Sequence, residues 1–587
     1  MLSAQIRKLL IEQYPGLDFK LDPPEVPSHG HYATNIAFMV AKRDKMSPLA
    51  AAEKIKLILG EAAPKNFFER IDVVTPGFIN FWLSKETIQG EFLRIAKAGD
   101  PTSSRKPGLR RARKETVIVE YSSPNIAKPM HVGHFRSTII GDAIANIHKA
   151  LGYKVIRWNY VGDWGTQFGK LTAAYKLWGD DKLLKKEPIK HLLELYVRFS
   201  AEAKINLELE KAGQEEFRKL EEGNKENRKL WEKFRKESLK ELHKTYKLLG
   251  VKFDVEIGES FYEKDLKYII SFLLSQEIAI KSEGAIIVPL DDMGLPPAMI
   301  QKSDGATLYL TRDIANLIYR IKKYKPAKII YEIGNEQDLH FKQLFAIAKA
   351  DFMPEMKEAK NTELTHVGHG LILGEDGKKL STRAGKTIFM EDVIEEAISL
   401  TREVVKEKES LPASSRRAGR FSAKQRDKIA KAVAIAALKY NDLSQNRLSN
   451  ITFDWKKMLS FEGDSGPYLL YSYARLKSIL RKASPVIAKR FYGVDVAHLN
   501  TPSELELILK LDRFAGIVEN VGKDYYPNHL ASYLYDLSKS VNHFYETEPV
   551  LKSEKNIRNA RLALIKSAAT VLKTGLNLLG IETLEKM

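Results

Sequence analysis

The sequence predicts a multidomain α/β protein: a small α/β unit, a central unit on a parallel sheet with a helical insertion, and an all-α C-terminal unit. The length of 587 residues favours about three to four domains. A strand, a helix and a second strand follow one another within residues 116–163, and this succession requires a parallel sheet with a right-handed crossover. After about Phe389, helical apolar spacing replaces strand-like runs.

Composition limits what such a chain can be. Hydrophobic residues make up 44% and charged residues 29%, a mix typical of globular proteins. No run of about 18 uncharged apolar residues occurs, so we expect no membrane span, and the first helix lacks the features of a secretory signal. The absence of cysteine excludes disulfides, thiolate zinc sites and a cysteine nucleophile. It also fits a cytoplasmic location.

The net charge indicates a polyanionic partner. Lys and Arg total 94 against 75 Asp and Glu, which gives +19. Such an excess is typical of proteins that bind nucleic acid, although solubilising lysines alone would give the same number. Residues 99–115 are basic and rich in Pro, Gly and Ser. This stretch is either a linker or a loop that faces RNA.

We predict three domains and their elements from these patterns. The N-terminal domain, 1–108, has a helix at 48–59 and two strands within 70–84 around a Pro-Gly turn. The central domain is 109–395 and the helical C-terminal domain is 396–587. The central elements are a strand at 116–123, a helix at 135–152, a strand at 153–163, a helical insertion at about 181–249, and strand signals at 285–290, 327–334 and around 364–372.

The tetrapeptide HVGH occurs twice, and the first copy is predicted to bind phosphate. His131, Gly133 and His134 follow a parallel strand and precede a helix. Ligands bind beyond the carboxyl ends of such strands, and a helix N-terminus offers N–H groups and a positive dipole end to an anion. Gly133 permits close approach of a nucleotide, and the histidines can donate to phosphate oxygens. The alternative is two surface histidines near a helix cap.

The second HVGH copy is predicted to be part of a strand. His366 and His369 lie in a strand-like run that leads into a Gly-Asp-Gly turn and a basic loop, and no helix is predicted directly after them. These histidines therefore lack the helix dipole and are poor candidates for phosphate chemistry.

The flanks of the first copy resemble a known family. The segment "VEYSSPNIAKPMHVGHFRS", followed by "NYVGDWGTQFGK", lies within residues 119–171. It is similar to the first signature block of class I arginyl-tRNA synthetases, in which Ser-Pro-Asn before HxGH is distinctive. The resemblance covers the chain from about residue 29 to Met587 and implies a Rossmann-type catalytic domain of the HxGH class.

The resemblance implies an ATP site. His131, Gly133 and His134 would contact the nucleotide, together with Lys379, Ser381 and Arg383 of "KKLSTR", which resembles the mobile KMSKS-type loop of the class. The second lysine of that loop is missing here, and Lys128, just before HVGH, would replace it. ATP would enter with Mg²⁺, and no structural metal is expected.

The resemblance also implies contacts to L-arginine and to tRNA(Arg). Tyr309 and Asp313 match positions that grip the guanidinium, and a carboxylate pairs well with that planar group. The further arginine contacts would be Glu120, Ser122, Asn125 and Gln337, and the tRNA contacts would be Phe78, Asn80, Tyr468, Tyr471 and Arg475. Phe78 could equally be a core residue. In the C-terminal stretch that contains Tyr468, Tyr471 and Arg475, we expect Leu469, Leu476 and Leu480 in the core.

The resemblance therefore implies a cytoplasmic, monomeric enzyme that makes arginyl-adenylate from arginine and ATP and transfers arginine to tRNA(Arg). Two alternatives stay open. One is a class I synthetase for another amino acid, which Asp313 and the Ser-Pro-Asn context disfavour. The other is a non-catalytic RNA-binding paralogue, which the presence of both HxGH and the basic loop disfavours.

Overall fold

The N-terminal part is an antiparallel sheet with helices packed against it. The structure is a computed structural model that describes residues 1–99, 101–102, 115–126, 129–349, 361–373, 389–410, 421–452, 454–483 and 494–587. The sheet has the order β1-β2-β4-β3. The elements of this part are α1 (Leu2–Gln13), β1 (Leu21–Asp22), β2 (Tyr32–Thr34), α2 (Ile36–Asp44), α3 (Pro48–Ala62), β3 (Phe68–Val74), β4 (Phe78–Leu83) and α4 (Lys85–Ala98).

The central part is built on a five-stranded parallel sheet of order β12-β11-β5-β6-β7. The strands of this sheet and the helices between them are β5 (Thr116–Glu120), α6 (Val132–Ala150), β6 (Lys154–Val161), α7 (Thr166–Trp178), β7 (Val255–Gly258), α13 (Tyr309–Tyr324), β11 (Lys328–Glu332), α14 (Asp338–Lys349) and β12 (Glu363–Val367). The short strand β13 (Ile372–Leu373) follows outside this sheet. The predicted strand–helix–strand unit is confirmed. The helix begins at Val132 instead of residue 135, because His131 caps it.

Both faces of the central sheet are buried, which explains the continuous apolar run of β5. Val117 and Val119 belong to one hydrophobic core and Ile118 to the other, and all three side chains are fully buried. A strand that is covered on two faces needs apolar residues at every position, whereas a half-exposed strand alternates. The run therefore identifies a strand in the middle of the sheet.

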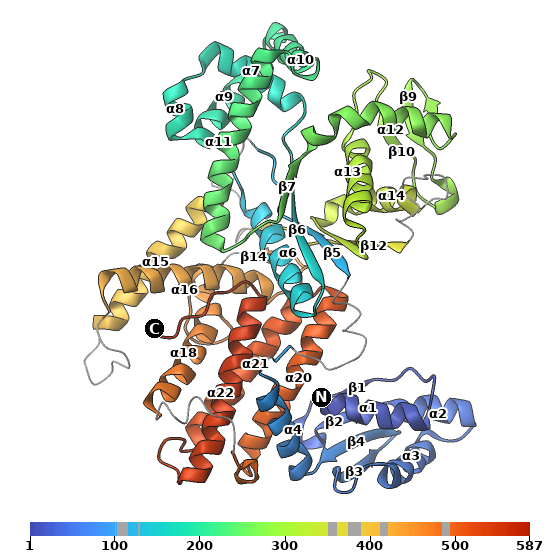
Figure 1. Cartoon of the computed structure of the whole chain (residues 1–587), viewed down its shortest axis with the longest axis vertical. Coiled ribbons are helices and arrows are strands. Elements are labelled where there is room, and N and C mark those ends of the chain that lie inside the picture. Colours follow the sequence, from blue (N-terminus) through green and yellow to red (C-terminus); the bar gives the residue numbers. More distant parts are fainter. Residues whose placement is uncertain are drawn as a thin grey trace.

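Two insertions extend from the central sheet. Between β6 and β7 lies the predicted helical insertion, with α8 (Asp181–Lys186), α9 (Pro188–Glu202), α10 (Leu207–Glu221) and α11 (Lys225–Leu249), and Figure 1 shows it as a separate lobe at the top. The second insertion contains α12 (Glu263–Ser275), β8 (Ile280–Ser282), β9 (Ala285–Val288) and β10 (Ala298–Gln301). The strand predicted at 285–290 is β9, which belongs to this small antiparallel sheet and not to the parallel one.

The C-terminal part is helical. Its elements are α15 (Met390–Ser410), α16 (Ala423–Leu443), β14 (Ile451–Thr452), α17 (Trp455–Met458), α18 (Gly466–Lys482), α20 (Pro502–Asp524), α21 (Pro527–Thr547) and α22 (Lys555–Leu578). The two-residue strand β14 pairs in parallel with β13 and so joins this part to the central one. The N-terminal part packs its α4 against α20 (Figure 1). Among the described residues, no helix is long and apolar enough to cross a membrane.

Candidate active site

The first HVGH forms the N-terminus of α6. The Gly133 N–H donates to His131 Nδ1 at 3.1 Å, and the His131 N–H donates to His134 Nδ1 at 3.3 Å. The two imidazole rings lie with their centroids 3.8 Å apart. Since each Nδ1 accepts a hydrogen bond, each ring in its neutral form carries its proton on Nε2, where it can donate to a phosphate oxygen. This arrangement suits an anion at the positive end of a helix.

Besides access for a nucleotide, packing gives a second reason for a glycine at position 133. A Cβ atom at this position would lie 2.9 Å from Cε1 of His131. Any side chain here would therefore displace the His131 ring from its place over the first turn of α6. The glycine is needed for the packing of the histidine pair itself.

The segment after the basic loop is anchored directly to the first HVGH. Phe389 forms an antiparallel bridge with His131, and the Met390 N–H donates to the Met130 carbonyl at 2.8 Å. Lys128, Lys379, Ser381 and Arg383 lie outside the described residues, within 127–128 and 374–388. Phe389, the first described residue after 374–388, lies beside His131.

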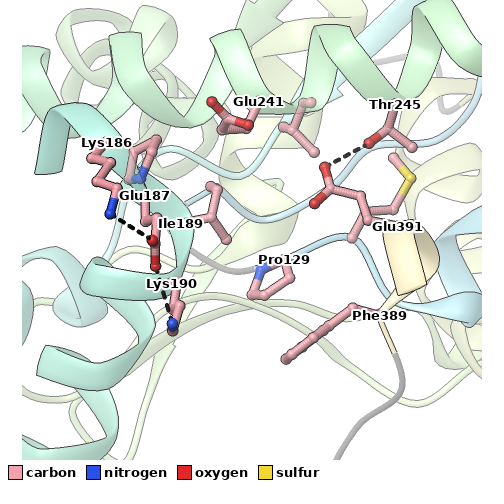
Figure 2. Close-up of a pocket in the computed structure, with 12 residues that line it drawn as sticks. Pro129, Lys186, Glu187, Ile189, Lys190, Glu241, Thr245, Phe389 and Glu391 are labelled. Carbon is pink, nitrogen blue, oxygen red and sulfur yellow. Dashed lines mark hydrogen bonds and ion pairs between the residues drawn. The ribbon is translucent and has the colours of Figure 1, made fainter. Parts of the chain in front are cut away.

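A cavity of about 210 Å³ lies next to this anchor. Figure 2 shows Glu241, from α11, and Phe389 at opposite sides of it, with Pro129 between them. Glu391 also lines the cavity and accepts a hydrogen bond from Thr245 Oγ1 at 3.1 Å. Partial burial raises the pKa of Glu391 above its usual range. The cavity lies between the helical insertion and residues Pro129 and Met130, directly before the first HVGH.

An acidic cluster of Glu120, Glu259 and Asp313 lies along the same edge of the sheet. Asp313 Oδ2 is 2.6 Å from His340 Nε2, and Tyr309, at the start of α13, is 63% exposed. Glu259 directly follows β7 and is only 7% exposed. Burial raises the pKa of Glu259 to about 8; Arg312 opposes the shift and the charge of Asp313 adds to it. Carboxylates that disfavour one another's charge create a site for a cation.

Glu120 ends β5 and is buried in an ion pair with Arg320, itself fully buried. Burial raises the pKa of the Glu120 carboxyl, although Arg320 opposes the shift. The ion pair satisfies part of the hydrogen-bonding capacity of the Glu120 carboxylate. Asp313 is close enough to raise the pKa of Glu120 further. Glu120 is therefore the most deeply buried carboxylate of the acidic cluster.

The other predicted arginine contacts lie near the same edge but differ in exposure. Asn125 is exposed and pairs with Gly162, directly after β6. Gln337 is exposed and follows β11. Ser122 is buried, and its Oγ lies 2.7 Å from Tyr246 OH and 2.9 Å from Thr138 Oγ1. The carboxyl ends of parallel strands converge at one edge, which is why residues far apart in the sequence meet here.

The strand prediction for the second HVGH is confirmed for His366 and Val367, which end β12, whereas Gly368 and His369 follow the strand. The His366 ring stacks on Phe341 with centroids 4.7 Å apart, and Nε2 lies 3.0 Å from the Ile333 carbonyl. His369 is buried, with Nδ1 2.8 Å from Glu332 Oε1. Burial alone would lower the pKa of His369, but Glu332 raises it above the usual value overall. Both histidines of this copy are thus engaged within the fold.

The two predicted RNA-reading residues of the N-terminal part differ in access. Phe78 is 44% exposed and meets Phe38 edge to face at 5.2 Å between centroids. Asn80 is 7% exposed in the middle of β4, between Ala33 and Asp72 of the neighbouring strands. Phe78 presents a ring for stacking, whereas the Asn80 amide is largely covered.

In the C-terminal part, the structure separates the tyrosines of α18. Tyr473 is buried, while Tyr468 and Tyr471 are half-buried. The Arg475 guanidinium lies over the Tyr471 ring at 5.0 Å and donates to Asn542 Oδ1 at 2.9 Å. The Asn542 amide in turn donates to Tyr468 OH at 2.7 Å. Leu469 and Leu476 are buried as predicted, and Leu480 packs against the core.

Glu259 and His340 neighbour the predicted residue Asp313 but were not singled out from the sequence. A signal for Glu259 was available, because "DVEIGES" is a short β-branched run that ends in a glutamate, and polar residues after a parallel strand face the ligand edge. His340 carries no such signal, since its role depends on the packing of α14 against α13. Within the described ranges, no group of three or more His, Asp and Glu residues is arranged to hold a metal ion.

Comparisons with known proteins agree with this geometry. Three family models match: "Arginyl tRNA synthetase N terminal domain" over 1–83, "tRNA synthetases class I (R), catalytic domain" over 102–455, and "DALR anticodon binding domain" over 469–587. The arginine–tRNA ligase of Clostridium botulinum is 39% identical over 585 residues, which cover 98% of each chain.

Solved structures share the whole architecture. The arginyl-tRNA synthetase of Plasmodium falciparum superposes with a TM-score of 0.80 at 26% identity, covering 100% of this chain and 98% of that one. The Thermus thermophilus arginyl-tRNA synthetase gives 0.79 at 26% identity, covering 100% and 99%. The chain therefore belongs to the class I arginyl-tRNA synthetases.

Proposed function

We propose that the chain joins L-arginine to tRNA(Arg) at the expense of ATP. One observation carries the proposal: the acidic cluster of Glu120, Glu259 and Asp313 lies along the same sheet edge as the N-terminus of the HVGH helix. A cation site beside an anion site suits a substrate with a guanidinium at one end and a carboxylate that must meet a phosphate at the other.

The arginine side chain would bind at the acidic cluster. Asp313 and Glu259 would pair with the guanidinium, and Tyr309 would cover it from the exposed side. Glu120, Asn125 and Gln337 would orient the α-ammonium and carboxylate ends. Ser122, whose hydroxyl already bonds Tyr246 and Thr138, would contribute through the loop that it stabilises.

The first step would be formation of arginyl-adenylate. A carboxylate oxygen of arginine attacks the α-phosphorus of MgATP, and the bond from that phosphorus to the bridging oxygen breaks, which releases pyrophosphate. His131 and His134 would stabilise charge on the α-phosphate as it develops. Lys128, Lys379, Ser381 and Arg383 would hold the triphosphate, and Mg²⁺ would arrive and leave with the phosphates.

The second step would transfer arginine to the 3′-terminal adenosine of tRNA(Arg), whose hydroxyl attacks the adenylate carbonyl and displaces AMP. Of the two predicted N-terminal contacts, the exposed Phe78 would contact the tRNA, whereas Asn80 is largely covered. Tyr468, Tyr471 and Arg475 would contact the anticodon loop. We propose domains at 1–108, 109–395 and 396–587 in a cytoplasmic monomer. The catalytic family model extends to residue 455, past the second proposed boundary.

Amino-acid-dependent exchange of radioactive pyrophosphate into ATP tests the proposal, measured for all twenty amino acids with and without tRNA. We expect exchange with arginine alone. Exchange with a different amino acid would establish the alternative class I specificity. Tight tRNA binding with no exchange and no aminoacylation under either condition would establish the non-catalytic alternative.

A further inference from the structure

Arg136 is a buried charge directly behind the first HVGH. It lies two residues after His134 on α6, and its side chain is completely buried. Its Nε donates to Asp442 Oδ1 at 3.2 Å, and its Nη1 donates to the Ser449 carbonyl at 2.7 Å. Asp442 is 2% exposed, near the end of α16. The partner of this catalytic-site helix therefore comes from the helical C-terminal part of the chain.

The segment that follows Asp442 also holds the tail of the second HVGH. The Gly370 N–H donates to the Arg447 carbonyl at 2.9 Å, and the Leu371 N–H donates to Asn450 Oδ1 at 2.8 Å. A Cβ at Gly370 would lie 2.6 Å from the Ser449 carbonyl oxygen, so the two backbones touch. Arg136 thus lies beneath the seam where residues 447–452 cover the strand tail.

The adjacent side of α6 is tied to the parallel sheet. Ser137 Oγ donates to the Glu332 carbonyl at 2.9 Å and accepts from the Ser122 N–H at 3.0 Å. Glu332 also pairs with His369 of the second HVGH. The first turns of α6 are therefore held from the sheet by Ser137 and from the helical part by Arg136. Without the attachment through Arg136, the N-terminus of α6 would be free to tilt about the attachment through Ser137.

A buried guanidinium requires a buried counter-charge, and Asp442 is the carboxylate that pairs with Arg136 across this seam. Such pairs often add little net stability compared with apolar residues of similar volume, so stability alone does not explain this one. The position of the pair behind the catalytic-site helix offers a better explanation, because displacing reacting groups by about 1 Å can cost about 100-fold in rate.

We propose that Arg136 and Asp442 are a positioning pair, which holds the first turn of α6, and with it His131 and His134, where the α-phosphate of ATP is attacked. The inference rests on the proposed function. It makes α16 a part of the catalytic scaffold, although α16 lies beyond the domain boundary proposed at residue 395. The second HVGH then contributes to the first through the seam that its tail forms with residues 447–452.

The test replaces both charges by apolar residues in the full-length chain. Arg136→Met/Asp442→Leu removes the pair without leaving a lone buried charge, so we expect a melting temperature close to wild type. We expect kcat for arginine-dependent ATP–pyrophosphate exchange to fall at least about tenfold, with KM for arginine within about twofold, because the acidic cluster is unchanged. The distal buried pair Arg561–Glu504, with Nε and Oε1 2.7 Å apart, provides a control for loss of a buried ion pair away from the site.

The control variant, Arg561→Met/Glu504→Leu, should keep the wild-type kcat in folded protein, with a lower melting temperature because Arg561 also pairs with Glu548 and Glu504 caps α20. A double variant at Arg136 and Asp442 that folds and retains kcat within about twofold would overturn the proposal, because the pair would then be structural only. If this double variant does not fold, Arg136→Lys decides. It keeps the charge but cannot reach Asp442 and Ser449 together, so an unchanged kcat overturns the proposal and a tenfold loss supports it. Wild-type protein that shows no arginine-dependent exchange would instead refute the proposed function.

Discussion

His131 and His134 form one unit at the start of α6: their rings lie with centroids 3.8 Å apart, and each Nδ1 accepts a backbone hydrogen bond from the first turn. The second HVGH spells the same residues but uses them to stack on Phe341 and to pair with Glu332. The same four letters therefore serve different purposes, which depend on whether a helix or a strand contains them.

This difference predicts unequal effects of alanine substitutions. His134→Ala removes a donor aimed at the transition state and should lower the rate of ATP–pyrophosphate exchange at least about 100-fold. His366→Ala should change the rate little in protein that remains folded. Steady-state exchange kinetics with melting curves would measure both. Equal losses in the two variants would contradict separate roles for the two copies.

Asp313 should determine the affinity for arginine. Asp313→Asn removes a charged partner of the guanidinium, and we expect kcat/KM for arginine to fall about 10- to 100-fold, as for loss of a hydrogen bond between charged groups. Asp292→Asn, at an exposed position of the same central part, is the control and should behave as wild type. Titration of arginine in exchange assays would check this, and a fall in kcat alone would argue against a binding role.

Glu259 should couple arginine binding to proton release. Its pKa of about 8 keeps it mostly protonated at pH 7 in the arginine-free protein, and a bound guanidinium favours the carboxylate. Binding therefore expels a proton, and arginine affinity should rise with pH between about 6 and 8 and then level off.

Calorimetry in buffers of different ionisation enthalpy would count the released protons. Glu259→Gln should bind arginine more weakly and abolish this proton release.

The same substitution bears on stability. The folded-state pKa is raised, so wild-type Glu259 costs stability increasingly as pH rises from the unfolded value towards 8, and the glutamine variant should lose less stability over that range. Proton release that persists in Glu259→Gln would assign it to another group.

Arg475 should serve the tRNA and not the adenylate site. Arg475→Ala removes the cation that lies over the Tyr471 ring and should raise KM for tRNA in aminoacylation, with a weaker dependence on salt concentration. Arg481→Ala, an exposed position later in α18, is the matched control. Equal effects of the two substitutions would indicate general charge attraction in place of a specific contact.

Much of the fold could be predicted because its signals are local. The run "TVIVE", the helix after HVGH and the strand "KVIRWNYV" follow the periodicities of strand and helix, which depend only on neighbouring residues. The position of β9 was not predictable in this way. Its β-branched run fits a parallel or an antiparallel sheet equally well, and only the insertion between β7 and α13 assigns it to the small one.

The sequence by itself determined the strand–loop–helix that presents His131 and His134, and the order of the signature segments. Only the tertiary structure decided which charges meet. Asp442 lies 306 positions from Arg136, Asp313 raises the pKa of both Glu259 and Glu120, and Asn80 is largely covered although a tRNA contact was predicted for it. The physical reason is that burial and counter-charge depend on how distant segments pack, whereas periodicity and helix capping depend on the local chain alone.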